Sequence, residues 1–523
     1  MTSITLANCQ ALLGDPAQMT REPVDIVIRD RRIAEIRPAG AQPPEGTAID
    51  GTNRLATPGM INGHNHSHEN FQKGRHENMP LEVWSNLNRP LIPWQFSPRH
   101  VYIRTMIGAI ESLRTGATTL VDDLIVGPVL RPDHIEAVLQ AYEDIGIRAL
   151  LAPGMNNQPL FDTLPYGRET FPPEVVKQLE NQEKTPPEEV MAFVRGLAKE
   201  RHPASRRVGT AISPSAPQRC TEPHLMAVRR LADDFDLPII IHVHETRLQV
   251  VTGQLFYGAP MVEYLGRIGF LRPGVSLIHV VWLNPREIDI LAETGATAQH
   301  NPVGNFSLAS GLCPVRELLK AGVNVSLGTD SCASSFTISM LRTLNATALA
   351  HNIRGDDPGD WITAGEAFSA ATLGGGRALG LGDDLGAIEV GRMADLDVWR
   401  LDGIAFTPLG DPLRQLVYCE NGDDLDAVII DGEIVMQDGR LVRVDEAALL
   451  AEARETYEEL KPQIDAAEEG LAGVMASCKT IYDRCLDHDI AARNSLAVSV
   501  PDQACRSSSP RGLGAEFARK QFF

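Results

Sequence analysis

Basic residues are scarce in this sequence. Its 523 residues include 48 Lys and Arg against 68 Asp and Glu, which gives a formal charge of -20 at pH 7. This balance disfavours nucleic acid as a partner, because a phosphate backbone requires a positively charged surface. It favours a neutral or cationic small molecule instead.

Regularly spaced cysteines and long apolar runs are also missing. The eight cysteines include no CxxC pair, so reduced thiols in a cytoplasmic protein are the simplest interpretation. No segment approaches the ~18 consecutive apolar residues that a membrane helix needs. The first residues, MTSITLANCQALLGD, lack a basic segment followed by a long apolar one. We therefore expect a chain that neither spans a membrane nor is exported.

The sequence does contain enough apolar residues, 43%, for a large buried core. Near each end, alternating apolar and polar residues predict β hairpins. The first is DIVIRDRRIAEI, from 25 to 36, and the second is DLDAVIIDGEIVMQDGRLV, from 424 to 442, where Asp-Gly pairs mark turns. The two ends predict one small β domain, made of residues 1–57 and 381–445.

Residues 58–380 alternate short apolar runs with helical patterns at intervals of roughly 30 residues, the rhythm of βα units around a parallel sheet. The predicted strands are GMINGH, ATTLVDD, IRALLAP, VGTAISP, PIIIHVH, VSLIHVV, ATAQHN and NVSLGTD. Eight parallel strands with intervening helices predict an α/β fold of the (β/α)8 TIM-barrel type. In that fold the chemistry takes place where the strands end.

Three further segments flank or interrupt this pattern. Residues 155–206 are rich in proline and charge, and they predict an insertion with one or two helices that shapes a pocket. Residues 446–493 have helical periodicity and predict one or two packed helices. Residues 494–523 are rich in Ser, Pro, Gly and Arg, which predicts a disordered tail.

Ionisable side chains stand at the ends of five predicted strands, namely His64 with His66, His242 with His244, His279, His300 and Asp330. Residues two apart in a strand share a face, so His64 and His66 can both point toward the barrel mouth. His68 lies beyond the strand end and need not follow them.

An isolated HxH pair is better explained as a solvated loop than as a metal site. Five strands that each end in His or Asp are harder to explain by packing, because buried ionisable groups are costly unless they are paired or bind metal. Neutral imidazoles and a carboxylate from separate strands are the ligand set of a catalytic metal site with an open position. The constellation therefore predicts a metal site.

Five motifs in this order, PGMINGHNH, HVHET, IHVVWL, QHNPVGNFSLASG and LGTDS, resemble those of the amidohydrolase superfamily. The resemblance is closest to its cytosine deaminase and triazine hydrolase (atrazine chlorohydrolase-like) branch, and it covers roughly residues 5–445. It implies a TIM barrel with a small β-sandwich domain built from the N-terminal and C-terminal segments. GAIEVGRMADLDVW resembles the return of the family's chain into that domain.

The resemblance implies one divalent metal ion per chain, held by the side chains of His64, His66, His242 and Asp330. Relatives with two metals use a carboxylated lysine, and neither the third nor the fourth predicted strand contains a lysine. Zinc is favoured, with iron or manganese as alternatives, because imidazoles and a carboxylate suit several metals. His244 shares a strand face with His242, so its contact with the metal stays open.

The resemblance also assigns catalytic roles. A divalent cation lowers the pKa of its bound water from 15.7 to near ~7, which supplies a hydroxide. Asp330 and His279 are expected to accept or orient the proton, and Glu245 to deliver a proton to the leaving nitrogen. Glu245 follows the ligand histidine by three, as in the family's HxxE pattern; a surface salt bridge with Arg247 is its alternative.

Substrate contacts are less well defined. Trp84 resembles a tryptophan near the family's pocket and can stack on a flat ring, or it is a core aromatic. His300 and Asn305 are expected to line the pocket, with a packing role for His300 as the alternative. The fourth strand contains Ser215 where relatives that deaminate nucleosides have histidine, and Lys73-Gly74 replaces an Arg-Gly pair.

Three functions are compatible with these residues. The first is a metal-dependent aminohydrolase that removes ammonia from an amino-substituted nitrogen heterocycle. The second is a hydrolase that displaces chloride or an alkylamine from a triazine-like ring, or cleaves an amide, urea or carbamate. The third is a barrel retained as an assembly module without activity, which would predict lost ligands. The resemblance implies a homodimer or larger homo-oligomer.

Overall fold

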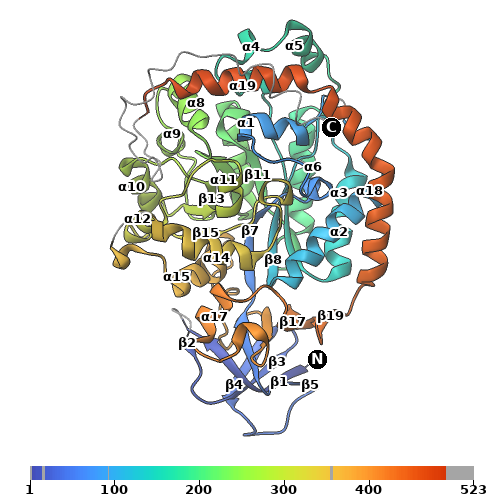
Figure 1. Ribbon diagram of the computed structural model, residues 1–523, viewed down its shortest axis with the longest axis vertical. Helices are drawn as coiled ribbons and strands as arrows, with labels where there is room; N and C mark the ends of the chain where they lie inside the picture. Colours follow the sequence, from blue (N-terminus) through green and yellow to red (C-terminus); the bar gives the residue numbers. More distant parts are fainter. Residues whose placement is uncertain (1–2, 15–17, 92, 354–356, 491–523) are drawn as a thin grey trace.

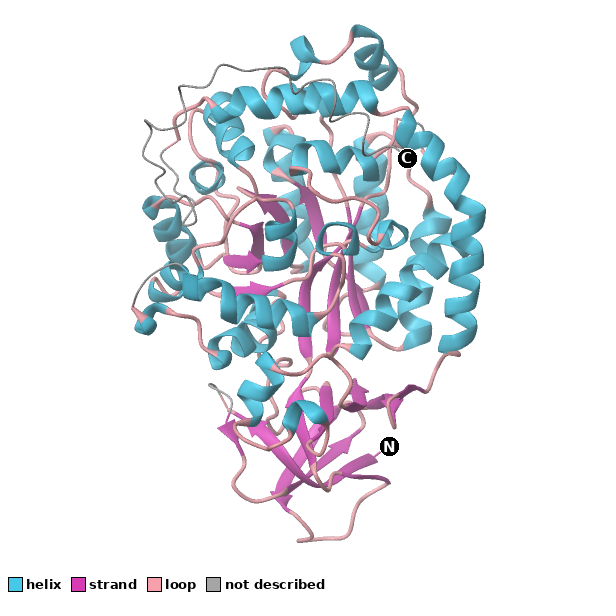
Figure 2. Ribbon diagram, viewed as in Figure 1, coloured by secondary structure: helices cyan, strands magenta, loops and turns pink. Residues whose placement is uncertain are grey.

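The computed structural model describes residues 3–14, 18–91, 93–353 and 357–490. The predicted tail, 494–523, lies outside these residues. Strands form the centre of the molecule, helices surround most of them, and a separate group of strands stands at one end (Figures 1 and 2).

Two parallel sheets contain all eight predicted strands, in their predicted order. The first sheet has the order β10-β9-β8-β7 and the second the order β11-β12-β13-β14-β15. Their bounds are β7 Met60–Asn65, β8 Ala117–Leu124, β9 Arg148–Pro153, β10 Val208–Thr210, β11 Ile212–Ser215, β12 Ile239–Val243, β13 Val275–His279, β14 Thr297–His300 and β15 Val325–Leu327. The predicted fourth strand is therefore two strands, interrupted at Ala211.

The two sheets adjoin at both edges. At one edge, Gly154 and Ser213 form a parallel bridge next to the interruption between β10 and β11. At the other edge, the backbone N–H of Asp330 donates to the carbonyl of His64 at 3.0 Å. The strands are buried along nearly their whole length, as expected for parallel strands covered on both faces.

Helices pack around the parallel strands (Figure 2). Their bounds are α1 Leu81–Trp84, α2 Pro98–Arg114, α3 Pro132–Ile145, α4 Gly167–Thr170, α5 Pro173–Glu180, α6 Pro187–Glu200, α7 Glu222–Phe235, α8 Arg247–Tyr257, α9 Met261–Arg267, α10 Pro285–Thr294, α11 Pro302–Ser307, α12 Val315–Lys320, α13 Cys332–Ser335, α14 Met340–Ala350, α15 Ala364–Ser369, α16 Gly375–Ala378, α17 Pro412–Tyr418, α18 Glu446–Glu469 and α19 Ala472–Leu486. The helices from α1 to α12 lie between the parallel strands in the sequence, and α13 to α19 follow the last of them, β15. Asn284 and Glu287 form a capping box that fixes the start of α10.

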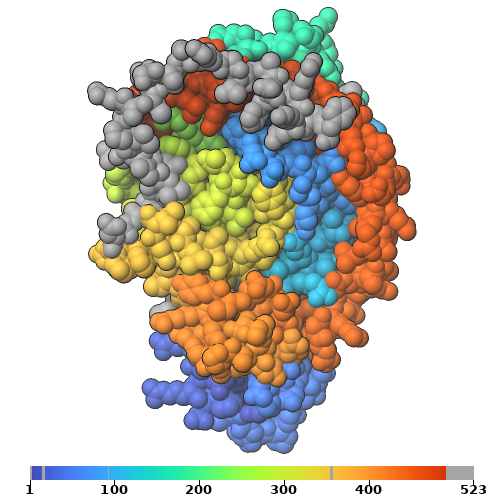
Figure 3. All heavy atoms as spheres, in the orientation of Figure 1, coloured from blue at the N-terminus to red at the C-terminus, as the bar shows by residue number. Residues whose placement is uncertain are grey.

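A mixed ten-stranded sheet combines strands from both ends of the chain. Its bounds are β1 Ser3–Leu13, β2 Gln18–Met19, β3 Val24–Arg29, β4 Arg32–Pro38, β5 Thr47–Asp50, β6 Arg54–Pro58, β16 Leu396–Arg400, β17 Leu425–Ile430, β18 Glu433–Gln437 and β19 Arg440–Leu441. β6 pairs with the distant β16 in antiparallel register. Figure 3 shows the orange C-terminal segment against the blue N-terminal one at this end of the molecule.

The hairpin turns of this sheet follow their sequence signals. Asp431 and Gly432 have φ angles of 57° and 74°, and Asp438 and Gly439 have 52° and 69°. Two consecutive positive φ angles match the right-handed twist of the flanking strands, and Asp-Gly adopts them readily. The predicted β units at 25–36 and 424–442 are both present.

Buried Arg148 connects the first parallel sheet to the mixed sheet. Its Nε lies 2.7 Å from Oδ2 of Asp395, which precedes β16, and its Nη2 lies 3.1 Å from Oδ1 of Asp431. Removing one partner of such a buried pair leaves the other charge in the interior, without a partner and without water. The two sheets are thus joined by a charge cluster in addition to apolar packing.

The insertion between β9 and β10 contains three α-helices, α4, α5 and α6, where one or two were expected. Short helices bounded by prolines leave little apolar periodicity in the sequence, which explains the difference. α19 crosses the same end of the molecule as α1, α4 and α8, while α18 lies along α2 (Figure 1). Within the described residues, every helix is too short or too polar to cross a membrane.

Candidate metal centre and active site

Six ionisable side chains from strand ends converge in the interior. Donor atoms of His64, His66, Asp123 and His242 all lie within 4.8 Å of one another, as do those of His64, His279 and Asp330. Oδ1 of Asp330 is 3.5 Å from Nε2 of His64 and 3.7 Å from Nε2 of His66. The structure therefore gathers all four predicted ligands at one place.

Backbone carbonyls fix the orientation of two of these imidazoles. Nδ1 of His66 lies 2.6 Å from the carbonyl of Asp123, and Nδ1 of His242 lies 2.8 Å from the carbonyl of Ser215. A carbonyl only accepts, so each Nδ1 carries the proton and each Nε2 presents a lone pair. This arrangement is typical of histidines that bind metal through Nε2.

His64 provides the test of whether a cation fits here. The residue is fully buried, and within the part of the chain that the structure describes neither of its ring nitrogens forms a hydrogen bond. A buried polar group without a partner is costly. A cation shared by Nε2 of His64, the neighbouring imidazoles and Asp330 would satisfy it, so the donor set fits a divalent metal.

The pKa shifts of three of the four proposed ligands suit metal binding. Burial opposes protonation of His66, but the nearby carboxylates of Glu69, Asp123 and Asp330 outweigh it, so the His66 pKa is raised. Burial and the neighbouring His66 lower the pKa of His64 to about 3, and burial lowers the pKa of His242 well below its usual value. Burial opposes ionisation of Asp330, but the adjacent His64 and His279 outweigh it, so the Asp330 pKa is lowered. Neutral imidazoles and an ionised carboxylate are the forms that bind metal.

Glu245 and His279 lie beside this cluster. Oε2 of buried Glu245 is 3.5 Å from Nε2 of His279, whose Nδ1 is 2.9 Å from Oδ1 of Asn305. Burial, together with the charges of Asp330 and Glu82, raises the Glu245 pKa well above its usual value. A carboxyl group that retains its proton near neutral pH is suited to act as an acid.

Arg247, the alternative partner of Glu245, points elsewhere. Its Nη2 donates to the backbone carbonyls of Leu486 and His488, at the end of α19. Glu245 is 3% exposed, which excludes a surface salt bridge.

His244 contacts the surrounding backbone and not the proposed metal ligands. Its Nε2 accepts the backbone N–H of Met261 at 2.9 Å, and its Nδ1 donates to the carbonyl of Trp282 at 2.7 Å. Both ring nitrogens are therefore used away from the cluster. The φ angle of 53° explains why His244 does not continue the strand face of His242.

Trp84, His300 and Asn305, the residues predicted to contact the substrate, have different surroundings. Trp84 is buried against Leu308 and Ala333, beside the segment that follows Asp330. His300 is buried with its Nε2 3.4 Å from Nε2 of His351. Asn305 orients His279, as described above.

The third histidine of the HxHxH run stays apart from the proposed ligands. Nε2 of His68 lies 3.4 Å from Oε1 of buried Glu69. The spacing argument, which selected His64 and His66 only, agrees with this placement.

Asp123 belongs to the cluster but was not among the predicted site residues. Its Oδ2 lies 3.6 Å from Nδ1 of His242. It is the last residue of the predicted strand ATTLVDD and the second-last residue of β8, so the strand-end rule applied to every predicted strand would have found it. Arg89, Arg219 and Glu82 also interact electrostatically with Glu245. They were not predicted, because they lie in loops and short helices without periodicity.

Several strands end in strained backbone. Ser215, His279 and Asp330 have φ angles of 68°, 77° and 60°. Non-glycine residues seldom adopt positive φ, and such strain gathers where function requires a particular side-chain direction. Ser215 and His279 are the last residues of β11 and β13, and Asp330 lies three residues after the end of β15.

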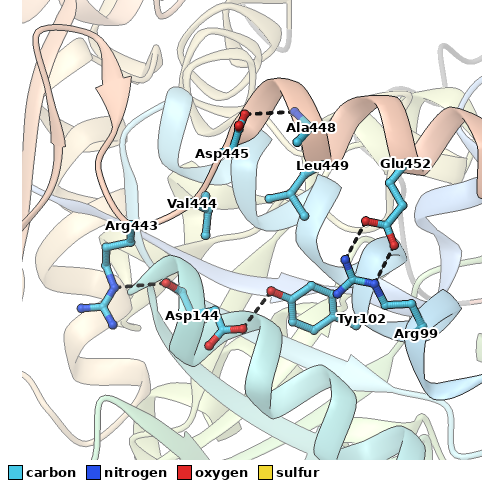
Figure 4. Close-up of a pocket in the computed structure, with 9 residues that line it drawn as sticks. All are labelled: Arg99, Tyr102, Asp144, Arg443, Val444, Asp445, Ala448, Leu449 and Glu452. Carbon is cyan, nitrogen blue, oxygen red and sulfur yellow. Dashed lines mark hydrogen bonds and ion pairs between the residues drawn. The ribbon is translucent and has the colours of Figure 1, made fainter.

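A separate pocket of about 600 Å³ lies between α2, α3 and the start of α18 (Figure 4). Its lining includes the bidentate pair of Arg99 with Glu452 and the hydrogen bond from Tyr102 to Asp144. None of the clustered histidines and carboxylates lines it. The chemistry is therefore located by the converging donors and not by this open surface pocket.

Known proteins are similar to this chain in sequence and in fold. The pattern of the Amidohydrolase family matches residues 55–435. A 5'-deoxyadenosine deaminase of Methanothermobacter thermautotrophicus is 34% identical over 436 residues, 83% of this chain and 94% of the relative. A 5-methylthioadenosine/S-adenosylhomocysteine deaminase of Thermococcus kodakarensis is 34% identical over 438 residues, again 83% and 94%.

Two solved structures are similar to this chain over most of its length. An adenosine deaminase from Xanthomonas campestris with bound zinc has a TM-score of 0.76 at 26% identity and covers 88% of this chain and 99% of its own. An atrazine chlorohydrolase from Arthrobacter aurescens TC1, complexed with zinc, has a TM-score of 0.78 at 27% identity, with 87% and 100% covered. The predicted resemblance is confirmed: this chain belongs to the amidohydrolase family.

Proposed function

We propose that this chain is a metal-dependent aminohydrolase that removes ammonia from an amino-substituted nitrogen heterocycle. The observation that carries the proposal is the convergence of His64, His66, His242 and Asp330, with Glu245 and His279 beside them. The relatives named as deaminases support the same reaction type.

We infer that the two parallel sheets close into one (β/α)8 barrel over residues 58–380. The hydrogen bond from Asp330 to His64 and the bridge from Gly154 to Ser213 support closure at both edges. The small β domain then comprises 1–57 and 381–445, and the C-terminal helices follow from 446.

One divalent ion, zinc by preference, fits the Nε2 atoms of His64, His66 and His242 and the carboxylate of Asp330. It would supply an activated water as nucleophile and polarise the substrate. Asp123 holds the site through its backbone carbonyl on His66 and lies close to His242.

Side chains of this protein can carry out the proton transfers. Asp330 is ionised and buried, so it can accept the proton of the attacking water. His279, oriented by Asn305, presents Nε2 toward Glu245 and can hold the nucleophile or the ring. Glu245 delivers its proton to the leaving nitrogen, because ammonia leaves far more readily than an amide anion.

Displacement of chloride or an alkylamine from a triazine-like ring is the second candidate. The similarity to an atrazine chlorohydrolase structure favours it. The same residues serve both reactions, so the mass of the product distinguishes them. We further propose a homodimer or larger homo-oligomer in the cytoplasm, which light scattering on the purified protein can test for assembly.

The test is ammonia release from a panel of aminopyrimidines, aminopurines, pterins and aminotriazines. We expect turnover of at least one ring by the metal-loaded protein and loss of turnover in His64→Ala and Asp330→Ala. Full metal loading without ammonia, chloride or amine release across the panel would count against both candidates.

A further inference from the structure

Two arginines border the candidate active site without a role in the proton chemistry. Arg219 ends a 3₁₀ helix, Pro217–Arg219, directly after β11. Arg89 follows another, Ser85–Asn88, which continues α1. They are 130 positions apart in the sequence, yet both guanidinium groups interact electrostatically with Asp123 and Glu245.

Arg219 is tied to a proposed metal ligand through one residue. Its Nη1 donates to the hydroxyl of Ser215 at 2.8 Å, and the carbonyl of Ser215 accepts from His242. Ser215 stands where nucleoside-deaminating relatives were expected to have histidine. In this chain the side chain at that position, Ser215, orients Arg219 instead.

Arg89 is positioned by the short helices before it. The hydroxyl of Thr246 donates to Oε1 of buried Glu82 in α1 at 2.5 Å, next to Glu245. Trp84 packs against Ala333, three residues after Asp330. The segment that ends at Arg89 is thus fastened to two of the strand ends that form the site.

The two positive charges are not balanced by ion pairs. Within the described residues, neither guanidinium forms a salt bridge with a carboxylate. Burial and the nearby charge of Arg89 lower the pKa of Arg219 to about 9. Both residues still retain intermediate solvent exposure. Holding two like charges close together in a partly desolvated place is costly, and a bound anion offsets that cost.

Three carboxyl groups, those of Glu69, Asp123 and Glu245, interact electrostatically with Arg89, and the last two also interact with Arg219. A guanidinium has five N–H donors, and Arg219 uses one of them for the hydroxyl of Ser215. Donors therefore remain on this side of the site for an oxygen ligand.

We propose that Arg89 and Arg219 bind an anionic oxygen group of the substrate, a carboxylate or a phosphate, attached to the heterocycle that is hydrolysed. A planar guanidinium donates two parallel hydrogen bonds to such a group, which gives strong and directional binding. This inference rests on the proposed function of the same site. It reverses, at this one place, the preference for neutral or cationic ligands that the net charge indicates.

The test uses matched compounds that differ only in the anionic group. They are pterin and pterin-6-carboxylate, cytosine and 5-carboxycytosine, and adenosine with its 5'-carboxylic acid and its 5'-monophosphate. Binding is measured on the metal-loaded protein as thermal stabilisation at graded concentrations, and ammonia release is followed in parallel. The variants are Arg89→Met, Arg219→Met and Arg219→Lys, with exposed Arg286→Met, whose partner is Glu293, as the control.

For at least one ring we expect the anionic member to bind about tenfold or more tightly than the neutral one. Arg89→Met and Arg219→Met should lose this advantage, Arg219→Lys should keep part of it, and Arg286→Met all of it. The proposal is overturned if no anionic member is preferred, or if the preference survives both methionine variants. A preferred carboxylate or a preferred phosphate identifies the group.

Failure of the two proposals can be told apart. Tight, arginine-dependent binding of an anionic ring without ammonia release would retain the anion site and reject the aminohydrolase. Ammonia release from neutral rings, unaffected by either methionine variant, would retain the aminohydrolase and reject the anion site.

Discussion

The backbone N–H of Asp330 donates to the carbonyl of His64 at 3.0 Å, and the side chains of the same two residues approach to 3.5 Å. The first and last parallel strands therefore meet where two proposed ligands stand. Metal binding and the joining of these strands should be coupled, because a ligand that binds only the folded chain stabilises it.

The metal centre is tested by elemental analysis. Wild type should contain about one divalent ion per chain, and both His242→Ala and Asp330→Ala should lose it. His202→Ala serves as control, because His202 contacts the carbonyl of Phe235 at a distant place. Chelation should lower the Tm of wild type more than that of Asp330→Ala. A well-folded wild type without metal would contradict the assignment.

Glu245→Gln should separate proton delivery from metal binding. The amide keeps the shape of the side chain but cannot donate an acidic proton, so kcat should fall by about 10²- to 10⁴-fold. Metal content should stay at the wild-type value. Glu293→Gln, on the exposed face of α10, is the matched control. Unchanged kcat in Glu245→Gln would assign the proton transfer to another group.

His244→Ala should affect stability and not metal content. The substitution leaves the N–H of Met261 and the carbonyl of Trp282 without partners in the interior. The expected loss is about 2 to 5 kcal/mol in the free energy of unfolding, measured by urea denaturation against His202→Ala. Loss of the metal from a stably folded variant would show that His244 does more than support the site.

Asp397→Asn should stabilise the protein increasingly as pH rises. Burial and the neighbouring Asp395 raise the Asp397 pKa well above its usual value, so the folded state prefers the protonated carboxyl. Wild type is then most favoured below the unfolded pKa, near ~3.9, and loses stability as pH increases toward the folded value. Asparagine does not titrate. The Tm difference between variant and wild type should grow from pH 4 to pH 8, whereas exposed Asp402→Asn should show no such trend.

Much of this architecture could be predicted because strands and turns leave local signals. The eight apolar runs and the Asp-Gly turns have short periods that report directly on burial and φ. The HxH pair at 64 and 66 and the histidine at 242 were found because strand ends of a parallel sheet gather in space.

Other features depend on contacts that sequence spacing does not encode. Arg89 and Arg219 are brought to the same site only by folding. Arg89 directly follows a short 3₁₀ segment and Arg219 ends another, and neither segment has a periodic pattern. The strand break at Ala211 and the positive φ of His244 redirect side chains in ways that regular alternation cannot anticipate. The contact between Oδ1 of Asn305 and Nδ1 of His279, at 2.9 Å, likewise joins two residues that are 26 positions apart.

The pairing of β6 with β16 has a consequence for synthesis. The indole of Trp399 donates to the hydroxyl of Thr57, 342 residues earlier. At about 5–20 residues per second, a ribosome needs about 20 to 70 s to make the chain between them. Throughout that time the N-terminal strands present an unpaired edge, which is a site for aggregation. Expression yield should therefore depend on chaperones that shield this edge until the second half of the sheet emerges.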